Sequence, residues 1–160
     1  MADRAGFEAF YAAHLPRVVR ACALVLLDRA ESEDVAAEAF ARLWSHWGRI
    51  HGEDHAGGYV FTTAMRLCSK RRRRAAREVV GAVPERGAPA GDPTDRGAVI
   101  DALRTLPLRQ RQSVVLRDWA GFPTQEVARI LGAKESTVRV HLARGRAALR
   151  ERLTVEEREG

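Results

Sequence analysis

The chain has 160 residues, of which 46% are hydrophobic and 30% charged, so it can bury a core and is not generically disordered. Its formal net charge is +6, and arginine supplies nearly all of the positive charge, since only Lys70 and Lys134 are lysines. Both cysteines, Cys22 and Cys68, lie among apolar neighbours, and the longest apolar run, residues 21–27, is shorter than the ~20 residues that cross a bilayer. These features predict a cytoplasmic protein with buried thiols and no membrane partner.

Apolar residues recur at helical spacing through the first 80 residues, with almost no strand signal. The opening helix contains Pro16, which is placed to kink or split it. Ser32 is the predicted N-cap of a second helix, because acidic residues follow it in the first turn. The glycine-rich residues 51–58 end that helix, and a third runs from about Tyr59 into a basic stretch. The residues expected to face inward are Phe7, Tyr11, Val18, Cys22 and Val25 in the first helix, Ala36, Phe40, Leu43 and Trp47 in the second, and Val60, Ala64 and Leu67 in the third.

The basic stretch "MRLCSKRRRRAAR", residues 65–77, carries seven positive charges and no acidic residue. Such a run is most often a solvated helix end, although a basic helix can also lie on anionic lipid. Lipid binding is the weaker interpretation, because no Trp or Phe accompanies the arginines on the outer face. A cradle for phosphates is the other interpretation, and the run alone does not decide between them.

Residues 81–97 are rich in glycine and proline and hold no large apolar residue beyond Val83. A segment of this composition buries too little apolar surface to offset its ordering entropy, so we predict a flexible linker. It separates a first module, residues 1–80, from a second module, residues 98–155. The expected fold class is all-α, with two small helical domains and a helix-turn-helix in the second.

The helix-turn-helix is predicted from the order of helix breaks in the second module. Pro107 begins a helix that ends at Gly121, and a short helix follows in "FPTQEVARILGA". Gly132 then supplies the tight turn before a longer final helix. The inward face of that final helix holds Val138, Leu142, Gly145, Leu149 and Leu153.

The opposite face of the final helix presents Arg139, Ala143, Arg146 and Arg150. Residues 136–150 contain no Asp or Glu, which disfavours a solvated face held by pairs of opposite charge. An unneutralised arginine stripe on the second helix of a helix-turn-helix favours entry into the major groove of DNA.

The sequence contains no pattern typical of a metal site or an enzyme. His46, His51 and His55 fit no zinc spacing and have no cysteine beside them, so surface histidines are expected. Phosphate-binding glycine loops, nucleophile elbows and paired carboxylates are not found. We therefore expect a protein that is not an enzyme and that needs no cofactor.

Four motifs in residues 102–153, "LP..QR", "LR.W.G", "EVA..LG" and "TV...L.R.R..L", resemble the C-terminal DNA-binding domain of bacterial extracytoplasmic-function (ECF) sigma factors. In the first module, "AESEDVAAEAFARLW" (30–44) resembles the helix with which that family binds core RNA polymerase, and "GGYVFTTAMRLCSKRRRR" (57–74) its promoter-melting helix. The resemblance covers nearly the whole chain, in order. It implies a factor, monomeric when free, that binds core polymerase, directs it to promoters and assists melting, with an anti-sigma factor as a further family expectation.

The resemblance also implies roles for individual residues. Residues 28–54 hold seven acids against three arginines, which suits a basic partner, and the polymerase-binding positions are Glu33, Asp34, Ala37, Glu38 and Arg42. Contacts to unpaired bases of the −10 element fall on Tyr59, Phe61, Thr62, Thr63 and Arg66, with Lys70, Arg71, Arg72, Arg73 and Arg74 on the phosphates. Contacts to the −35 element fall on Lys134, Thr137, Arg139, Val140, Ala143, Arg144 and Arg146.

Four positions depart from the family pattern. Many members carry Gln where this chain has Ala37, Asn where it has Arg66, and Ser or Thr where it has Lys134. The change at Arg66 alters the expected −10 base preference. Val140 replaces a common polar residue, which points to an apolar contact such as a thymine methyl group.

Two other functions would fit parts of the chain. A free-standing helix-turn-helix regulator, with the first module as a dimerisation domain, would bind a palindromic site tightly by itself. A binder of RNA or of a lipid surface, driven by residues 66–77, would associate in a salt-sensitive and sequence-independent way.

Overall fold

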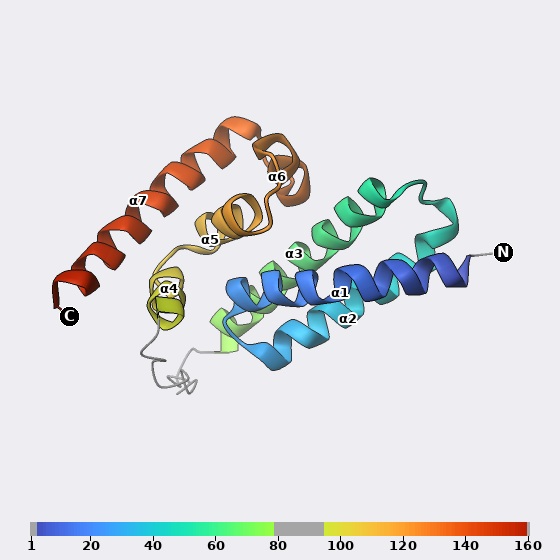
Figure 1. Cartoon of the computed structure of the whole chain (residues 1–160), viewed down its shortest axis with the longest axis horizontal. Coiled ribbons are helices and arrows are strands. Elements are labelled where there is room, and N and C mark those ends of the chain that lie inside the picture. Colours follow the sequence, from blue (N-terminus) through green and yellow to red (C-terminus); the bar gives the residue numbers. More distant parts are fainter. Residues whose placement is uncertain (1–2, 79–94, 160) are drawn as a thin grey trace.

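The computed structural model describes residues 3–78 and 95–159, and each element in those ranges is helical (Figure 1). The helices are α1 (Arg4–Leu26), α2 (Arg29–His46), α3 (Glu53–Glu78), α4 (Asp95–Arg104), α5 (Leu108–Val114), α6 (Thr124–Leu131) and α7 (Glu135–Glu159). A 3₁₀ turn at Trp47–Arg49 follows α2, and a π-helical turn at Val115–Trp119 follows α5. The predicted all-α class is confirmed.

The first module is a bundle of α1, α2 and α3. Helix α1 begins at Asp3, whose carboxylate accepts a backbone N–H of the first turn at 3.0 Å. It continues through Pro16 without being split, because Phe10 and Val18 are buried on either side of the proline and hold both halves against the bundle. Leu27, in the left-handed conformation with φ of 56°, ends the helix.

Helix α1 corrects the expectation that no segment is long enough to cross a membrane. Its 23 residues and a mean hydropathy of 1.3 meet that test by length and composition alone. The core helix of a protein that spans no membrane passes the same test. Here Val18, Cys22 and Val25 are buried where α1 packs against α2 and α3.

Two predicted helix starts in the first module are wrong. Helix α2 is capped by Asp28, which accepts the Glu31 N–H at 3.0 Å, and Ser32 lies inside the first turn with its hydroxyl donating to the Asp28 carbonyl. Helix α3 begins at Glu53 and not near Tyr59. Tertiary packing along α3 outweighs the low helix propensity of the two glycines in its first turns.

The second module contains α4 to α7. Residues 81–94 of the predicted linker lie outside the described residues, and its last three, 95–97, form the first turn of α4. Helix α5 starts after Pro107, and Gly121 (φ 81°) follows its π-helical extension. Gly132 (φ 63°) ends α6 in the left-handed conformation that the turn requires, so the predicted helix-turn-helix of α6 and α7 is confirmed.

The predicted inward faces are largely buried. Val138 and Leu142 of α7 are buried, and Leu149 is partly buried. Phe7, Trp47 and Leu153 are likewise only partly buried, and Tyr11, at 38% exposed, is the exception among the predicted inward residues. The rings of Tyr11 and Phe40 meet edge to face, with centroids 5.0 Å apart.

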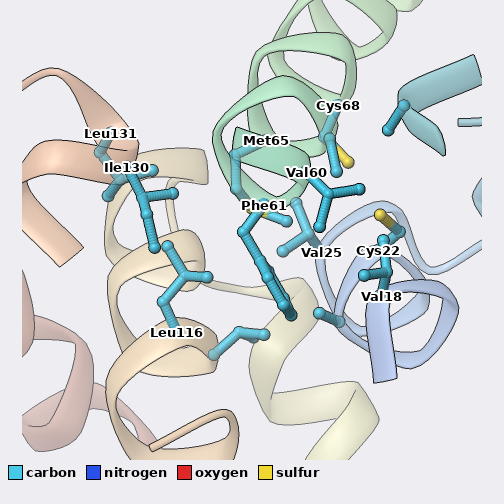
Figure 2. Close-up of a cluster of buried hydrophobic side chains, with 14 of the residues drawn as sticks. Val18, Cys22, Val25, Val60, Phe61, Met65, Cys68, Leu116, Ile130 and Leu131 are labelled. Carbon is cyan, nitrogen blue, oxygen red and sulfur yellow. The ribbon is translucent and has the colours of Figure 1, made fainter. Parts of the chain in front are cut away.

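The two modules share one hydrophobic core. Figure 2 shows side chains of α1 and α3 in the same cluster as Leu116, Ile130 and Leu131 of the second module. In Figure 1, α7 lies on the far side of α5 and α6 from the first module. The longest helix of the second module is therefore not part of the contact between the modules.

Two buried polar side chains of α5 also join the modules. Arg111 donates to the Val25 carbonyl of α1 at 2.6 Å and to two carbonyls of its own module. Gln112 donates to the Met65 carbonyl and to the Ser69 hydroxyl of α3 at 3.2 and 3.1 Å. These bonds satisfy polar atoms that would otherwise be buried without partners.

Candidate nucleic-acid and polymerase interfaces

Helix α2 presents an exposed face at the positions matched to polymerase binding. Glu33, Asp34, Ala37 and Arg42 are exposed, and Glu38 is half-buried. Two of the acids are paired along the helix, Glu38 with Arg42 at 2.8 Å and Glu33 with Arg29 at 3.3 Å. Asp34 makes no ion pair within the described residues. It is therefore the acid on this face best placed to meet a basic partner.

Aromatic and apolar side chains beside this face were not predicted as part of it. Trp44 of α2 is 40% exposed, and Tyr11 and Val19 of α1 line a groove of about 730 Å³ between α1 and α2 that also reaches Ala37. Exposed aromatic residues next to charged ones are typical of protein–protein interfaces. The helical spacing of Tyr11 predicts a core position, so no separate pattern in the sequence points to this groove.

The predicted −35 contacts lie together on the outer face of α7 and the turn before it. All seven, Lys134, Thr137, Arg139, Val140, Ala143, Arg144 and Arg146, are exposed. Helix α7, which carries most of them, lies on the side of α5 away from the first module (Figure 1). The seven side chains are therefore accessible to a partner in this arrangement.

The sequence of α7 predicts an arginine stripe without acidic partners, but two of these arginines are paired with acids in the structure. Arg146 makes two hydrogen bonds, at 2.8 and 2.6 Å, to the carboxylate of Asp118 in the π-helical turn. Arg139 pairs with Glu135 at 2.7 Å. Arg144 makes no ion pair in the part of the chain that the structure describes.

In the bridge between Asp118 and Arg146, each partner stabilises the charged form of the other. The hydrogen bond from Arg146 and its positive charge hold the pKa of Asp118 below its usual value, and Asp118 raises the pKa of Arg146. Asp118 was missed because the two residues are 28 positions apart, and no periodic pattern links a residue in one helix to its partner in another. The bridge fixes the Arg146 guanidinium on the recognition face.

The basic end of α3 is mostly accessible. Lys70, Arg73 and Arg74 are exposed, as is Arg66, and Arg71 and Arg72 are half-buried. Arg66 and Arg73 line a crevice of about 90 Å³ with Arg109 of α5. This places part of the predicted phosphate-contacting stretch at the edge of the contact between the modules.

The positions predicted to contact unpaired bases are mostly covered in this arrangement. Phe61 is 1% exposed, so in this structure it is a core residue and is not available to a base. Tyr59, Thr62 and Thr63 are half-buried, and the Tyr59 hydroxyl lies 3.0 Å from Nδ1 of His46. In this arrangement Phe61 does not line an open path, and its contact with unpaired bases stays a prediction.

What covers Phe61 is the segment that leads into α6. The rings of Phe61 and Phe122 meet edge to face, with centroids 4.9 Å apart. The guanidinium carbon of Arg17 lies 5.4 Å from the Phe61 centroid and 5.1 Å from that of Phe122, and Arg17 also donates to the Ala120 carbonyl. Neither Arg17 nor Phe122 was predicted as a site residue.

Neither the histidines nor the cysteines form a reactive centre within residues 3–78 and 95–159. These ranges contain no group of three His, Cys, Asp or Glu side chains that could hold a metal ion. Cys22 and Cys68 are buried free thiols, as predicted. The pKa of the Cys68 thiol is raised, mainly by a hydrogen bond with Cys22 and secondly by burial. The thiol therefore stays protonated and unreactive.

Comparison with known protein families gives two matches along the chain. The family described as Sigma-70 region 2 matches residues 10–78, and that described as Sigma-70, region 4 matches residues 96–149. Among characterised relatives, the ECF RNA polymerase sigma factor SigL of Mycobacterium tuberculosis is 31% identical over 166 residues, covering 98% of this chain and 92% of SigL. The RNA polymerase sigma-E factor of Streptomyces coelicolor is 29% identical over 157 residues, covering 94% and 88%.

Two solved structures share the fold. One is the sigma factor RpoE of Bartonella quintana in complex with the anti-sigma factor NepR, with a TM-score of 0.77 and 22% identity over 94% of this chain and 98% of that one. The other is CnrH in complex with the cytosolic domain of CnrY, with a TM-score of 0.72 and 21% identity over 96% and 90%. At these identities the likeness concerns the fold.

Proposed function

The chain belongs to the ECF family of RNA polymerase sigma factors, and from that premise we propose how its surfaces divide the work of such a factor. It binds core RNA polymerase, directs it to specific promoters and assists promoter melting. We propose that residues 1–80 bind the polymerase and the −10 element, that residues 98–155 bind the −35 element, and that residues 81–97 link them.

The observation that carries this assignment is the order of three exposed surfaces along the matched regions. An acidic face on α2 and a basic end on α3 lie within the Sigma-70 region 2 match, and an exposed basic recognition face on α7 lies within the region 4 match. A factor that must hold a protein and two separate DNA elements needs three such surfaces. Joining two weak DNA readers raises their combined affinity when the polymerase holds them at the right spacing.

We propose the polymerase contact on Glu33, Asp34, Ala37, Glu38 and Arg42. The exposed Trp44 and the groove between α1 and α2 extend that surface, because the groove adjoins Ala37. Asp34 would supply the charge that meets a basic helix of the polymerase. The aromatic side chain would supply apolar area at the edge of the contact.

We propose the −35 contacts on the outer face of α7. Arg144 is free of ion pairs among the described residues and projects from the recognition helix, so it is suited to a guanine edge. Arg146, held by Asp118, is suited to a phosphate, where a fixed guanidinium sets register. Val140 is exposed and apolar, which suits a thymine methyl group.

The chemistry of transcription would remain with the polymerase. We propose that the chain has no catalytic site of its own and acts in the cytoplasm, where the polymerase and the chromosome are. Of the two solved structures with the same fold, one is a sigma factor in complex with an anti-sigma factor, and the other is CnrH in complex with the cytosolic domain of CnrY. We propose that this chain is also controlled by an anti-sigma factor.

A free-standing regulator is not favoured by the comparisons. That hypothesis needs the first module to be a dimerisation domain, whereas residues 10–78 match Sigma-70 region 2. Binding to RNA or lipid through the basic run would leave the exposed face of α7 without a role.

The test is reconstitution of transcription. Core RNA polymerase with and without the chain is given genomic DNA, and the 5′ ends of the transcripts are sequenced. We expect new start sites that share two upstream elements and that require the chain. Start sites identical to those of core polymerase alone would refute the proposed function.

A further inference from the structure

The second module covers the part of α3 that is assigned to unpaired bases and leaves the recognition face of α7 open. Phe61 and Leu116, from opposite modules, lie in one buried cluster (Figure 2). The ring of Phe122 meets Phe61 with centroids 4.9 Å apart. The outer face of α7, in contrast, is exposed, and the helix lies on the side of α5 away from the first module (Figure 1). The closed arrangement therefore masks one DNA-contacting surface and not the other.

The groups at the masked surface are those that hold an unpaired base. Arg17 places its guanidinium within 5.4 Å of the Phe61 ring centre and 5.1 Å of the Phe122 ring centre. Proteins hold single-stranded bases by stacking them on aromatic rings and on arginine, in a way that tolerates any base. Phe61 and Arg17 together have the chemistry of a base-binding subsite. Phe122 occupies the place that a base would take there.

A carboxylate accompanies the ring of Phe122. Glu126, four residues later in α6, pairs with Arg129 at 3.4 Å and faces the backbone of α3, where a Cβ at Gly58 would lie 3.4 Å from its Oε1. With Phe122 it lines a cavity of about 730 Å³ whose other wall includes Tyr59 and Thr62. Because Arg129 offsets the charge of Glu126, the ring of Phe122 is the group that resembles part of a nucleotide, namely its base.

We propose that Phe122 acts as an internal mimic of an unpaired base, which fills the subsite of Phe61 and Arg17 until promoter DNA displaces it. The inference rests on the proposed function and adds a regulation of its −10 surface. It also adds Arg17, which lies on α1 and outside the promoter-melting helix, to the residues that contact bases.

The other contacts between the modules suit an interface that opens. Arg111 is 1% exposed and donates to carbonyls at 2.6 to 3.2 Å, but it has no carboxylate partner among the described residues, and its Nε makes no hydrogen bond there. The desolvation of a buried cation without a counter-charge offsets most of what its hydrogen bonds contribute. This buried cation therefore adds little to the stability of the closed form, so a ligand specific for the open form has less to overcome.

The first test compares Phe122→Ala with Trp119→Ala in the full chain. Trp119 is an exposed aromatic residue a few positions earlier that touches neither Phe61 nor Arg17 in the recorded aromatic and cation–π contacts. Each protein is titrated into a short fluorescein-labelled single strand of randomised sequence, and anisotropy is measured. We expect about tenfold tighter binding for Phe122→Ala, because the aromatic and cation–π contacts that favour the closed form are lost, and no change for Trp119→Ala. Unchanged affinity of Phe122→Ala, with helix content equal to that of the parent by circular dichroism, would overturn the proposal.

A second variant separates the masking from the base contact. Arg17→Gln removes the cation and a donor to Ala120, so small-angle X-ray scattering should show a larger radius of gyration than for the parent. Its affinity for the strand should not rise, since a base contact is lost as well. A variant as compact as the parent would refute the closing role of Arg17, and tighter binding would refute its role at the base.

The parent chain provides the reciprocal test. Saturation with the same strand should expand it, because bound DNA and the closed contact exclude each other. A chain that binds the strand and stays compact would rule out competition. Transcription with core polymerase is measured separately. If the chain supports initiation at promoters but shows none of these changes, the proposed function stands and the internal mimic is refuted.

Discussion

Replacing Gly145 in α7 with alanine should destabilise the protein, although alanine is the better helix former. A Cβ at this position would lie 2.9 Å from Cγ2 of Val114 in α5 and 3.5 Å from Cβ of Gln110. Val114 is buried and β-branched, so its side chain has little freedom to turn away. Overpacking of this kind costs ~1–3 kcal/mol, whereas the gain from replacing a helical glycine is ~0.5–1 kcal/mol. The clash should win by about 1 kcal/mol.

Gly57 in α3 is the matched control, because it is also helical but has no atom within 4 Å of a Cβ built there. Gly57→Ala should therefore raise stability by ~0.5–1 kcal/mol. Thermal unfolding followed by circular dichroism should show midpoints that move in opposite directions, by roughly 2–4 °C per kcal/mol for a chain of this size. If Gly145→Ala raises the midpoint as Gly57→Ala does, α5 and α7 are not as closely packed as described.

A third variant identifies the source of the clash. Val114→Ala in the Gly145→Ala background removes the methyl group that the new Cβ meets. The double-mutant cycle should give a favourable coupling between the two changes. Independent effects of the two substitutions would count against the contact between α5 and α7 as the cause.

Three further predictions concern the proposed surfaces. Asp34→Arg should weaken capture by immobilised core polymerase at least tenfold, since it reverses the unpaired charge on the α2 face, whereas Glu157→Arg at the end of α7 should not; equal capture of both would remove Asp34 from the contact. Arg144→Ala should cost ~1–3 kcal/mol of discrimination at one upstream base pair, measured with holoenzyme on a library of promoters, and unchanged selectivity would exclude a base contact. Asp118→Asn should lower stability by at most ~1 kcal/mol at neutral pH, because the bridge to Arg146 is partly exposed. Since the pKa of Asp118 is lowered, the bridge contributes above the pKa of an unfolded aspartate, about 3.9, and is lost as the pH falls through the folded value, so parent and variant should converge in acid. A difference that persists in acid would show that the side chain acts by packing.

Local signals predicted the elements whose ends are set by nearby residues. Pro107 and Gly132 lie where a proline begins a helix and a left-handed glycine ends one, and neither depends on distant contacts. The start of α2 could have been predicted as well, because Asp28 followed by Glu31 at the third helical position is a capping pattern. The acids that follow Ser32 point to a later start, but Glu33 and Asp34 lie in the second turn of the helix that Asp28 caps.

The width of the apolar face of α3 is a further local signal, which indicates contacts beyond the first module. The helix carries an apolar stripe that is wider than the face which its two partners in a three-helix bundle would cover. The stripe consists of Val60, Phe61, Ala64, Met65 and Leu67. The excess is what the second module packs against. The family pattern implies a base contact for Phe61, whereas its apolar neighbours on α3 favour a place in the core.

Periodicity, caps and charge along the chain by themselves determined three features: the helical fold, the helix-turn-helix of the second module, and the excess of acids in residues 28–54 and of basic residues in 65–77. Each of these depends on residues within a few turns of one another. Only the tertiary structure decided that Asp118 neutralises Arg146 and that Phe122 covers Phe61. Those pairs lie far apart in sequence and meet only because the two modules and their helices pack against one another. No spacing along the chain encodes which surfaces will meet.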